Sequence, residues 1–186
     1  MKKCFLLLVF LISEVFGKVE KKFNLEDLEN YFDNIKQIES EFTEKNIKKK
    51  YHGKFFLNKT RKNMEMTYTD RPLKITVKNY EAEMYDSKLE EHTKIPVHSS
   101  PLAFLLKNKI NLKKEVKVID LSENNNILEI KLCKKNSDEN GAITLKFSKN
   151  PFKLIGWKIF EDKNYNFEDK ITEFSLINPS IQMKKL

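Results

Sequence analysis

Residues 51–78 read YHGKFFLNKTRKNMEMTYTDRPLKITVK. Apolar and polar side chains alternate here in three short runs, over residues 51–57, 64–68 and 73–77. A period of two is the pattern of a strand that buries one of its faces, so the sequence predicts three strands. Polar residues that favour turns separate the runs, which is typical of an antiparallel meander.

Similar runs continue toward the C-terminus, and we expect further strands near residues 84–85, 89–95, 116–121, 127–133, 143–147, 154–160 and 170–176. Two segments have a helical pattern instead. Apolar residues between Leu25 and Phe42 form one stripe, which predicts a helix that ends near Asn46. Ser100 and Pro101 open a short apolar helix over residues 102–106. These elements predict a mainly β fold of the α+β class, with an antiparallel sheet curled around helices as a half-barrel or a barrel.

The N-terminus has the pattern of an export signal. Lys2 and Lys3 precede the apolar run CFLLLVFLI at residues 4–12, and Gly17 offers a small residue for cleavage. We predict a signal peptide over residues 1–17 and a single domain over residues 18–186, located in the periplasm. A retained membrane anchor is the alternative, although the run is well short of the roughly 20 residues that cross a bilayer. After cleavage only Cys133 remains, so the apolar core must stabilise the fold without an internal disulfide.

Charge and composition limit the classes of partner. The chain has 186 residues and a net charge of +8, but Arg61 and Arg71 are its arginines and the other cations are lysines. Such a bias is typical of an AT-rich genome, and a lysine face can also attract an anionic membrane or an acidic partner. Nucleic-acid binding favours arginine with exposed aromatics, so we expect no nucleic-acid partner.

The sequence lacks the patterns of catalytic and metal sites. We find no phosphate-binding glycine loop and no Cys/His spacing typical of zinc. His52, His92 and His98 fall in or beside different predicted strands, and Cys133 has no activating base nearby in the sequence. We therefore expect a protein that is not an enzyme and that has neither a metal nor a cofactor.

Four motifs, taken in order, resemble the LolA family of periplasmic outer-membrane lipoprotein carriers. Residues 37–44, QIESEFTE, are similar to the family's sF-x-a-x-F-T-Q signature, with Glu44 in place of Gln. Residues 53–57, GKFFL, are similar to its G-x-Φ-W-Φ strand. Residues 85–93, YDSKLEEHT, and 99–106, SSPLAFLL, are similar to its Y-D-x-x-L-x-Q-V-T and x-T-P-x-x-L-L motifs. The resemblance runs from about residue 25 to residue 177.

The chain departs from the family pattern at several places. The Arg-Pro that the family has after the strand matched by residues 53–57 is absent here. Arg61 is the preferred match to the family's arginine, and Lys59 is the rival. Met64 and Met66 stand where the family has aromatic residues. The sequence ends soon after Pro179, so the resemblance implies that the family's usual last strand and tail are lacking.

The resemblance implies a fold, a role and partners. The fold is an incomplete antiparallel β-barrel, or half-barrel, covered by the N-terminal helix and a short apolar lid helix. The role is that of a monomeric chaperone that binds the acyl chains of lipoproteins and ferries them from the inner to the outer membrane. Its implied partners are acylated lipoproteins, the inner-membrane ABC transporter that releases them and an outer-membrane lipoprotein receptor.

Alternation along the strands supplies candidates for the lipid-binding cavity: Phe55, Leu57, Met64, Met66, Tyr68, Ile75, Val77 and Met84. The lid candidates are Leu102, Phe104, Leu105 and Leu106, and the resemblance implies that Arg61 acts as a latch on the lid. Each apolar candidate could instead be ordinary packed core. The alternative functions are a periplasmic module that binds or transfers lipid or glycolipid, a periplasmic hydrolase, and an adhesin-like β protein.

Overall fold

The computed structural model describes residues 24–79, 81–95, 105–107, 109–135, 141–160 and 171–184. The predicted signal peptide and the start of the predicted lid, residues 99–104, lie outside these ranges. The elements are α1 (Leu25–Asn34), β1 (Ile35–Lys45), β2 (Lys50–Asn58), β3 (Asn63–Tyr68), β4 (Leu73–Lys78), β5 (Glu81–Asp86), β6 (Glu91–Ile95), α2 (Leu112–Glu115), β7 (Val116–Asn124), β8 (Ile127–Lys134), β9 (Ala142–Lys149), β10 (Phe152–Phe160) and β11 (Ile171–Met183).

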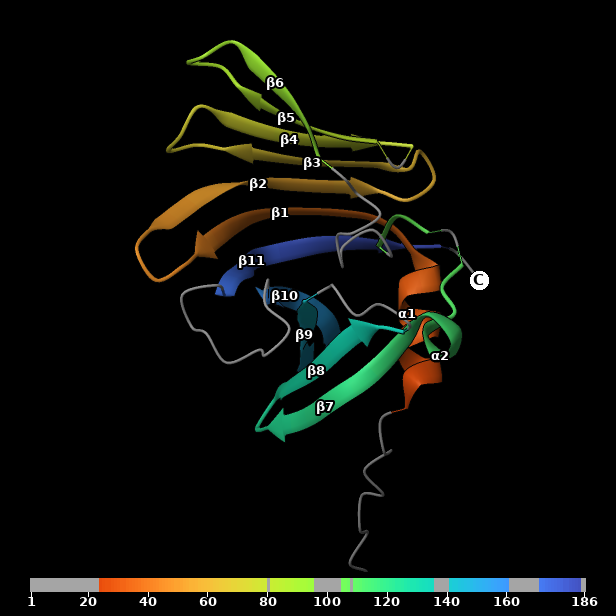
Figure 1. The fold of residues 1–186 in the computed structure, drawn as a ribbon. Coiled ribbons are helices and arrows are strands. Elements are labelled where there is room, and N and C mark those ends of the chain that lie inside the picture. The colour runs from red at the N-terminus through yellow and green to blue at the C-terminus, as the bar shows by residue number, and fades with distance from the viewer. Residues whose placement is uncertain are drawn as a thin grey trace, which may run out of the picture.

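All the strands belong to one antiparallel sheet of 11 strands in the order β6-β5-β4-β3-β2-β1-β11-β10-β9-β8-β7 (Figure 1). The chain builds one half outward from β1 to β6. It then builds the other half inward from β7 to β11, which pairs with β1. The edge strands β6 and β7 remain apart in this order, so the sheet is open. The prediction of an incomplete antiparallel barrel with helices is confirmed.

The sheet bends so strongly that its two halves touch through side chains. Strands β1 and β11 lie between β2 and β10. In a flat sheet, with strands about 4.8 Å apart, β2 and β10 would therefore be about 14 Å apart. Nevertheless the ring centroids of Phe55 on β2 and Trp157 on β10 are 5.4 Å apart. The two rings therefore lie on a concave face, and the interior at this point is filled by aromatic side chains.

Helix α1 begins at a well-formed cap. The side chain of Asn24 accepts a hydrogen bond from the backbone N–H of Asp27 at 2.9 Å, and Glu26 and Asp27 place negative charge in the first turn. Its buried side includes Tyr31 and Phe32, whose rings meet Phe147 of β9 edge-on at 5.5 and 6.0 Å. Helix α1 thus packs on the concave face over the β9–β10 half.

The predicted long helix is wrong beyond Asn34, because the chain continues as strand β1. Pairing with β2 places Ile38, Ser40, Phe42 and Glu44 on the same face of β1. Two of these four inward-facing residues are polar, so the apolar ones are four positions apart. That spacing imitates a helical stripe, although the backbone is extended.

Helix α2 and the segment before it pack beside α1 (Figure 1). The backbone N–H of Ile110 donates to Asp33 Oδ1 at 2.9 Å, and that of Lys113 donates to Glu29 Oε1 at 3.2 Å. Leu112 of α2 is fully buried in the common core. Within the described ranges, neither helix has the length and apolar character needed to cross a bilayer.

Candidate functional site

The strand register gathers all the predicted cavity residues on one face of β2–β5. Phe55 lies opposite Met66, Met66 opposite Ile75, and Ile75 opposite Met84. Residues directly opposite one another in antiparallel strands project from the same face. The members of this set, which we call the lipid-face residues, are Phe55, Leu57, Met64, Met66, Tyr68, Ile75, Val77 and Met84.

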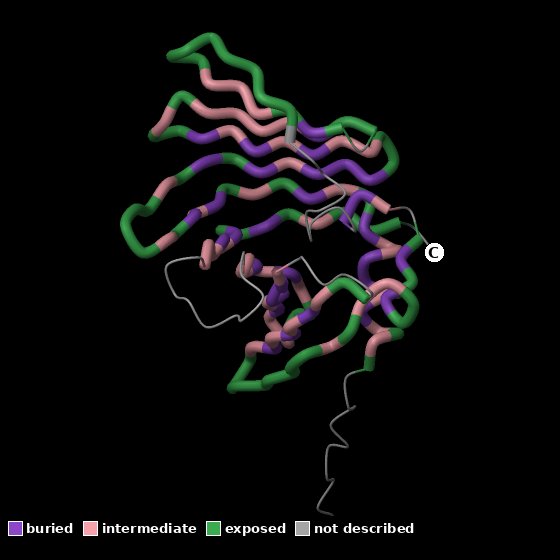
Figure 2. Tube along the Cα trace, viewed as in Figure 1, coloured by how far each residue is buried: buried purple, intermediate pink, exposed green. Residues whose placement is uncertain are grey.

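The lipid-face residues are mostly covered in this structure. Ile75 and Met84 are half-buried, and the other members are buried in one core that also includes Leu28 and Phe32 of α1 (Figure 2). An acyl chain can therefore reach the buried ones only when covering groups move. The two buried methionines suit such a change, because their flexible thioether side chains adapt to different neighbours. Contact between these residues and lipid stays a prediction.

The structure describes part of the predicted lid. Leu105 and Leu106 are 1% and 0% exposed and belong to the same core as the lipid-face residues. Leu102 and Phe104 lie outside the described residues. The described part of the lid segment thus occupies the apolar interior.

The two latch candidates have different environments. Arg61 is exposed in the turn between β2 and β3, where its backbone N–H donates to Asn58 Oδ1 at 2.9 Å. Lys59 is only 2% exposed, and its Nζ donates to the carbonyl oxygen of Phe32 in α1 at 2.6 Å. Burial lowers the pKa of Lys59 to about 8; the charge of Asp33 raises it, and that of Lys184 lowers it further. This arrangement favours Lys59 over Arg61, although the latch role itself stays a prediction.

Lysines from distant parts of the chain cap the C-terminus of α1. The carbonyl of Phe32 accepts from Lys59, as described above. The carbonyl of Asp33 accepts from Lys184 Nζ at 2.6 Å, and that of Asn34 accepts from the backbone N–H of Lys184 at 2.7 Å. The last carbonyls of a helix lack the usual partner four residues on, although that of Phe32 also accepts from the backbone N–H of Ile35, and cations are favourable at this negative end. Lys59 follows β2 and Lys184 follows β11, so the cap ties α1 to the central part of the sheet. Sequence reasoning missed Lys184, since no local pattern connects it with α1.

A polar cluster lies toward the other end of these strands. Glu44 is 7% exposed; its Oε2 accepts from the Tyr68 hydroxyl and, at 2.8 Å, from Arg71 Nη2. The Arg71 guanidinium carbon lies 3.7 Å from the ring centroid of Tyr68 and 4.0 Å from that of Tyr51. Burial, with the hydrogen bond to Glu44 and its charge, raises the pKa of Tyr68. Sequence reasoning missed Arg71. The available signal was that arginine is rare in this chain, with Arg61 as the other one.

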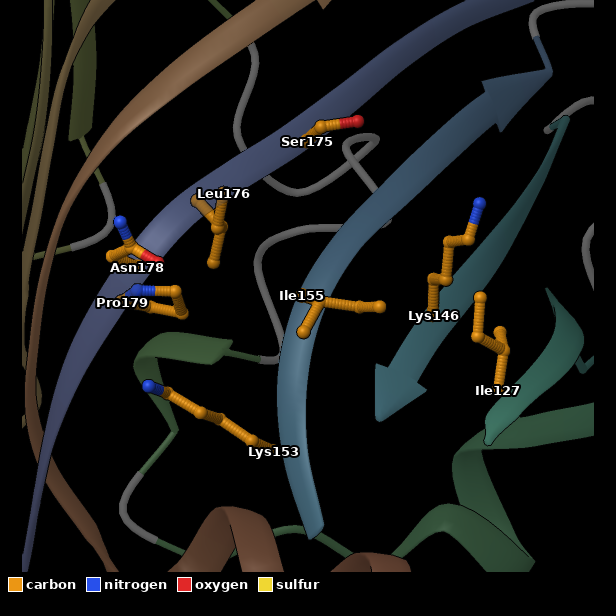
Figure 3. Close-up of a pocket in the computed structure, with 8 residues that line it drawn as sticks. All are labelled: Ile127, Lys146, Lys153, Ile155, Ser175, Leu176, Asn178 and Pro179. Carbon is orange, nitrogen blue, oxygen red and sulfur yellow. The ribbon is translucent and has the colours of Figure 1, made fainter. Parts of the chain in front are cut away.

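A pocket of about 470 Å³ opens on the other face of the sheet (Figure 3). Ser175 lies opposite Gly156, and Gly156 lies opposite Lys146, so these residues face away from the concave side. The pocket is lined by Ile127, Lys146, Lys153, Ile155, Ser175, Leu176, Asn178 and Pro179. Lys146 lies 3.4 Å from Glu129 and 3.7 Å from Glu173, which balance its charge. This pocket is distinct from the predicted cavity.

The described histidines do not converge. His52 Nδ1 lies 3.0 Å from Asp70 and His92 Nδ1 lies 2.9 Å from Glu83, both at exposed positions, and His98 lies outside the described residues. The described part of the chain holds no group of three His, Cys, Asp or Glu side chains that could bind a metal.

The family of the outer membrane lipoprotein carrier protein LolA matches residues 33–181, from the end of α1 into β11. The chain belongs to the LolA family. This confirms the resemblance stated from the motifs. The family consists of periplasmic carriers that bind lipoproteins and is not an enzyme family.

Other known proteins are similar over most of the chain. The uncharacterized protein RP864 of Rickettsia prowazekii is 29% identical over 97% of this chain and 90% of its own. An uncharacterized conserved protein of Thermus thermophilus shares the fold at a TM-score of 0.50, with 8% identity, 87% of this chain covered and 86% of the other. MucB of Pseudomonas aeruginosa, solved with MucA, matches at a TM-score of 0.46 and 6% identity, over 84% of this chain and 55% of the other.

Proposed function

We propose that this protein is a periplasmic carrier that binds the acyl chains of lipoproteins on its concave face and ferries them from the inner to the outer membrane. The observation that carries the proposal is the lipid-face register, which puts an adaptable apolar surface on one side of an open, curved sheet. In this proposal residues 1–17 direct export and residues 18–186 form the single carrier domain. Membership of the LolA family supports the same role.

The physical requirement is a substitute for the membrane interior. Each methylene group exposed to water costs about 0.8 kcal/mol, so a chain of about fifteen faces roughly 12 kcal/mol. Loading requires groups such as Leu105 and Leu106 to leave the core, so that the acyl chain takes over their apolar contacts. The inner-membrane ABC transporter supplies the work for loading, and the outer-membrane receptor takes the cargo by binding it more tightly.

Lys59 is the latch in this mechanism. Its bond to the Phe32 carbonyl ties the β2–β3 turn to α1 when the site is empty. Movement of α1 breaks that bond and lets water or solvated groups replace it. The latch therefore raises the free energy of opening, and the net affinity for cargo is correspondingly lower.

Purification of the exported protein after incubation with membranes that contain the transporter, followed by native mass spectrometry, tests the proposal. Met84→Glu places a charge on the lipid face at a half-buried position that tolerates it. Thr67→Glu is the matched control, because Thr67 lies on the opposite face between Lys54 and Lys74.

We expect bound acylated lipoprotein with the wild type and Thr67→Glu, and at least a tenfold loss with Met84→Glu. Far-UV circular dichroism checks whether each variant is folded. Bound free lipid or glycolipid in place of lipoprotein would identify the chain as a lipid-transfer module instead. Absence of any ligand from the wild type would rule out the carrier function.

A further inference from the structure

Trp157 carries a buried hydrogen-bond donor that has no acceptor. It is the single tryptophan of the chain, lies in β10 and is 1% exposed. Its indole Nε1 is buried and makes no hydrogen bond with any part of the chain that the structure describes. An indole N–H can only donate, and a buried donor without an acceptor destabilises the protein.

The ring of Trp157 is on the concave face. It lies opposite Phe174 of β11 and Leu145 of β9, and both of these are buried. It stacks on the ring of Phe174 at 5.3 Å, with 23° between the planes, and it contacts the lipid-face residue Phe55 at 5.4 Å. These are apolar neighbours, so a purely apolar ring would fill the same space without an unpaired donor.

The neighbours of Trp157 also indicate what kind of molecule could carry an acceptor for its indole N–H. A group that reached Trp157 from the lipid face would pass Phe55, which lies opposite Met66. Its attached portion would therefore rest on apolar side chains. An acyl carbonyl meets both requirements, because its oxygen is a strong acceptor and its hydrocarbon chain is apolar.

We propose that the Trp157 indole N–H donates a hydrogen bond to an ester carbonyl of the bound acyl cargo. This inference rests on the carrier function and names the chemical group that the site recognises. Trp157 then selects ester-linked acyl chains over ether-linked alkyl chains of the same length. The bound ester thereby supplies the acceptor that Nε1 lacks among the described residues.

A pair of synthetic lipopeptides separates this polar contact from general apolar binding. Both carry a glyceryl-cysteine head with two 16-carbon chains, joined by ester bonds in one probe and by ether bonds in the other. Affinities for both are measured with wild type and Trp157→Phe, and the double comparison cancels packing changes that affect both probes equally. We expect wild type to bind the ester probe about tenfold more tightly, a difference of about 1.4 kcal/mol. Trp157→Phe should bind the two within twofold.

A second readout uses wild type alone, so it does not depend on the variant folding. The single indole N–H gives one resonance in a ¹H–¹⁵N spectrum, and it should move downfield with the ester probe but not with the ether probe. Equal wild-type affinities for the two probes, or the same preference in Trp157→Phe, would overturn the inference and leave the carrier function intact. Failure of wild type to bind either probe would overturn both.

Discussion

Replacing Lys59 with methionine should change how stability depends on pH. The pKa of a lysine in an unfolded chain is about 10.4, whereas burial lowers that of Lys59 in the folded protein to about 8. Between these values the unfolded chain binds a proton that the folded protein does not. The free energy of unfolding therefore rises with pH across this window.

The magnitude follows from the width of the window. Each pH unit corresponds to about 1.36 kcal/mol per proton, so the free energy of unfolding should rise by roughly 2–3 kcal/mol between pH 8 and pH 10. Below pH 8 both states are protonated, and Lys59 adds no slope. Above pH 10 Tyr31 acts in the opposite direction, because burial raises its pKa to about 12 and the folded protein then holds the extra proton. Measurements should therefore stop at pH 10.

Urea unfolding at pH 7.5, 8.5, 9.25 and 10, followed by circular dichroism, measures this slope. Lys59→Met keeps most of the side-chain length but removes the charge. At pH 7.5 the relieved burial of charge should offset only part of the lost bond to Phe32, so we expect a net loss of about 1 kcal/mol. Lys54→Met, an exposed position on β2, is the control and should retain the wild-type slope. Parallel curves for wild type and Lys59→Met from pH 8 to 10 would refute the reasoning.

Three further substitutions test the ties within the fold. Gly53→Ala should destabilise the fold by about 2–3 kcal/mol, because the new Cβ would lie 2.5 Å from a backbone oxygen of β3 and 2.6 Å from a ring carbon of β1. Urea unfolding measures the loss of stability, and a loss below about 0.5 kcal/mol would contradict this prediction. Tyr31→Phe leaves the Leu154 N–H without the hydroxyl that accepts from it at 2.9 Å, so we expect a loss of about 1–3 kcal/mol and faster amide exchange at Leu154. Arg61→Met should leave lipopeptide affinity within twofold of wild type, whereas Lys59→Met should raise it; the reverse order would assign the latch to Arg61.

The strands were predictable because their inward positions are consistently apolar. In β3, Met64, Met66 and Tyr68 are buried and alternate with less buried polar residues, so the period of two is visible in the sequence. Strand β1 lacks this regularity, since Ser40 and Glu44 share the inward face with Ile38 and Phe42. Alternation also leaves open which face is the inner one, and only the register with the neighbouring strands resolves that.

The polar contacts were not predictable, because each depends on residues far apart in the chain. Lys59 and Arg61 look alike in a polar turn, and the difference arises from the Phe32 carbonyl at the end of α1. Glu44 and Arg71 look like surface charges, yet they form a part-buried ion pair at 2.8 Å. Sequence periodicity describes where apolar side chains go, while these pairs depend on where helices and turns end in space.

A carrier must bind its cargo tightly enough to cross water and weakly enough to give it up. The roughly 12 kcal/mol available from one acyl chain is a gross figure, from which the free energy of opening the closed protein is subtracted. The Lys59 cap on α1 and the core packing of Leu105 and Leu106 both add to that cost. A protein in which these ties were absent would hold its cargo more firmly and would deliver it less readily. In the proposed mechanism, then, the ties that stabilise the empty protein are also what makes transfer to a receptor favourable.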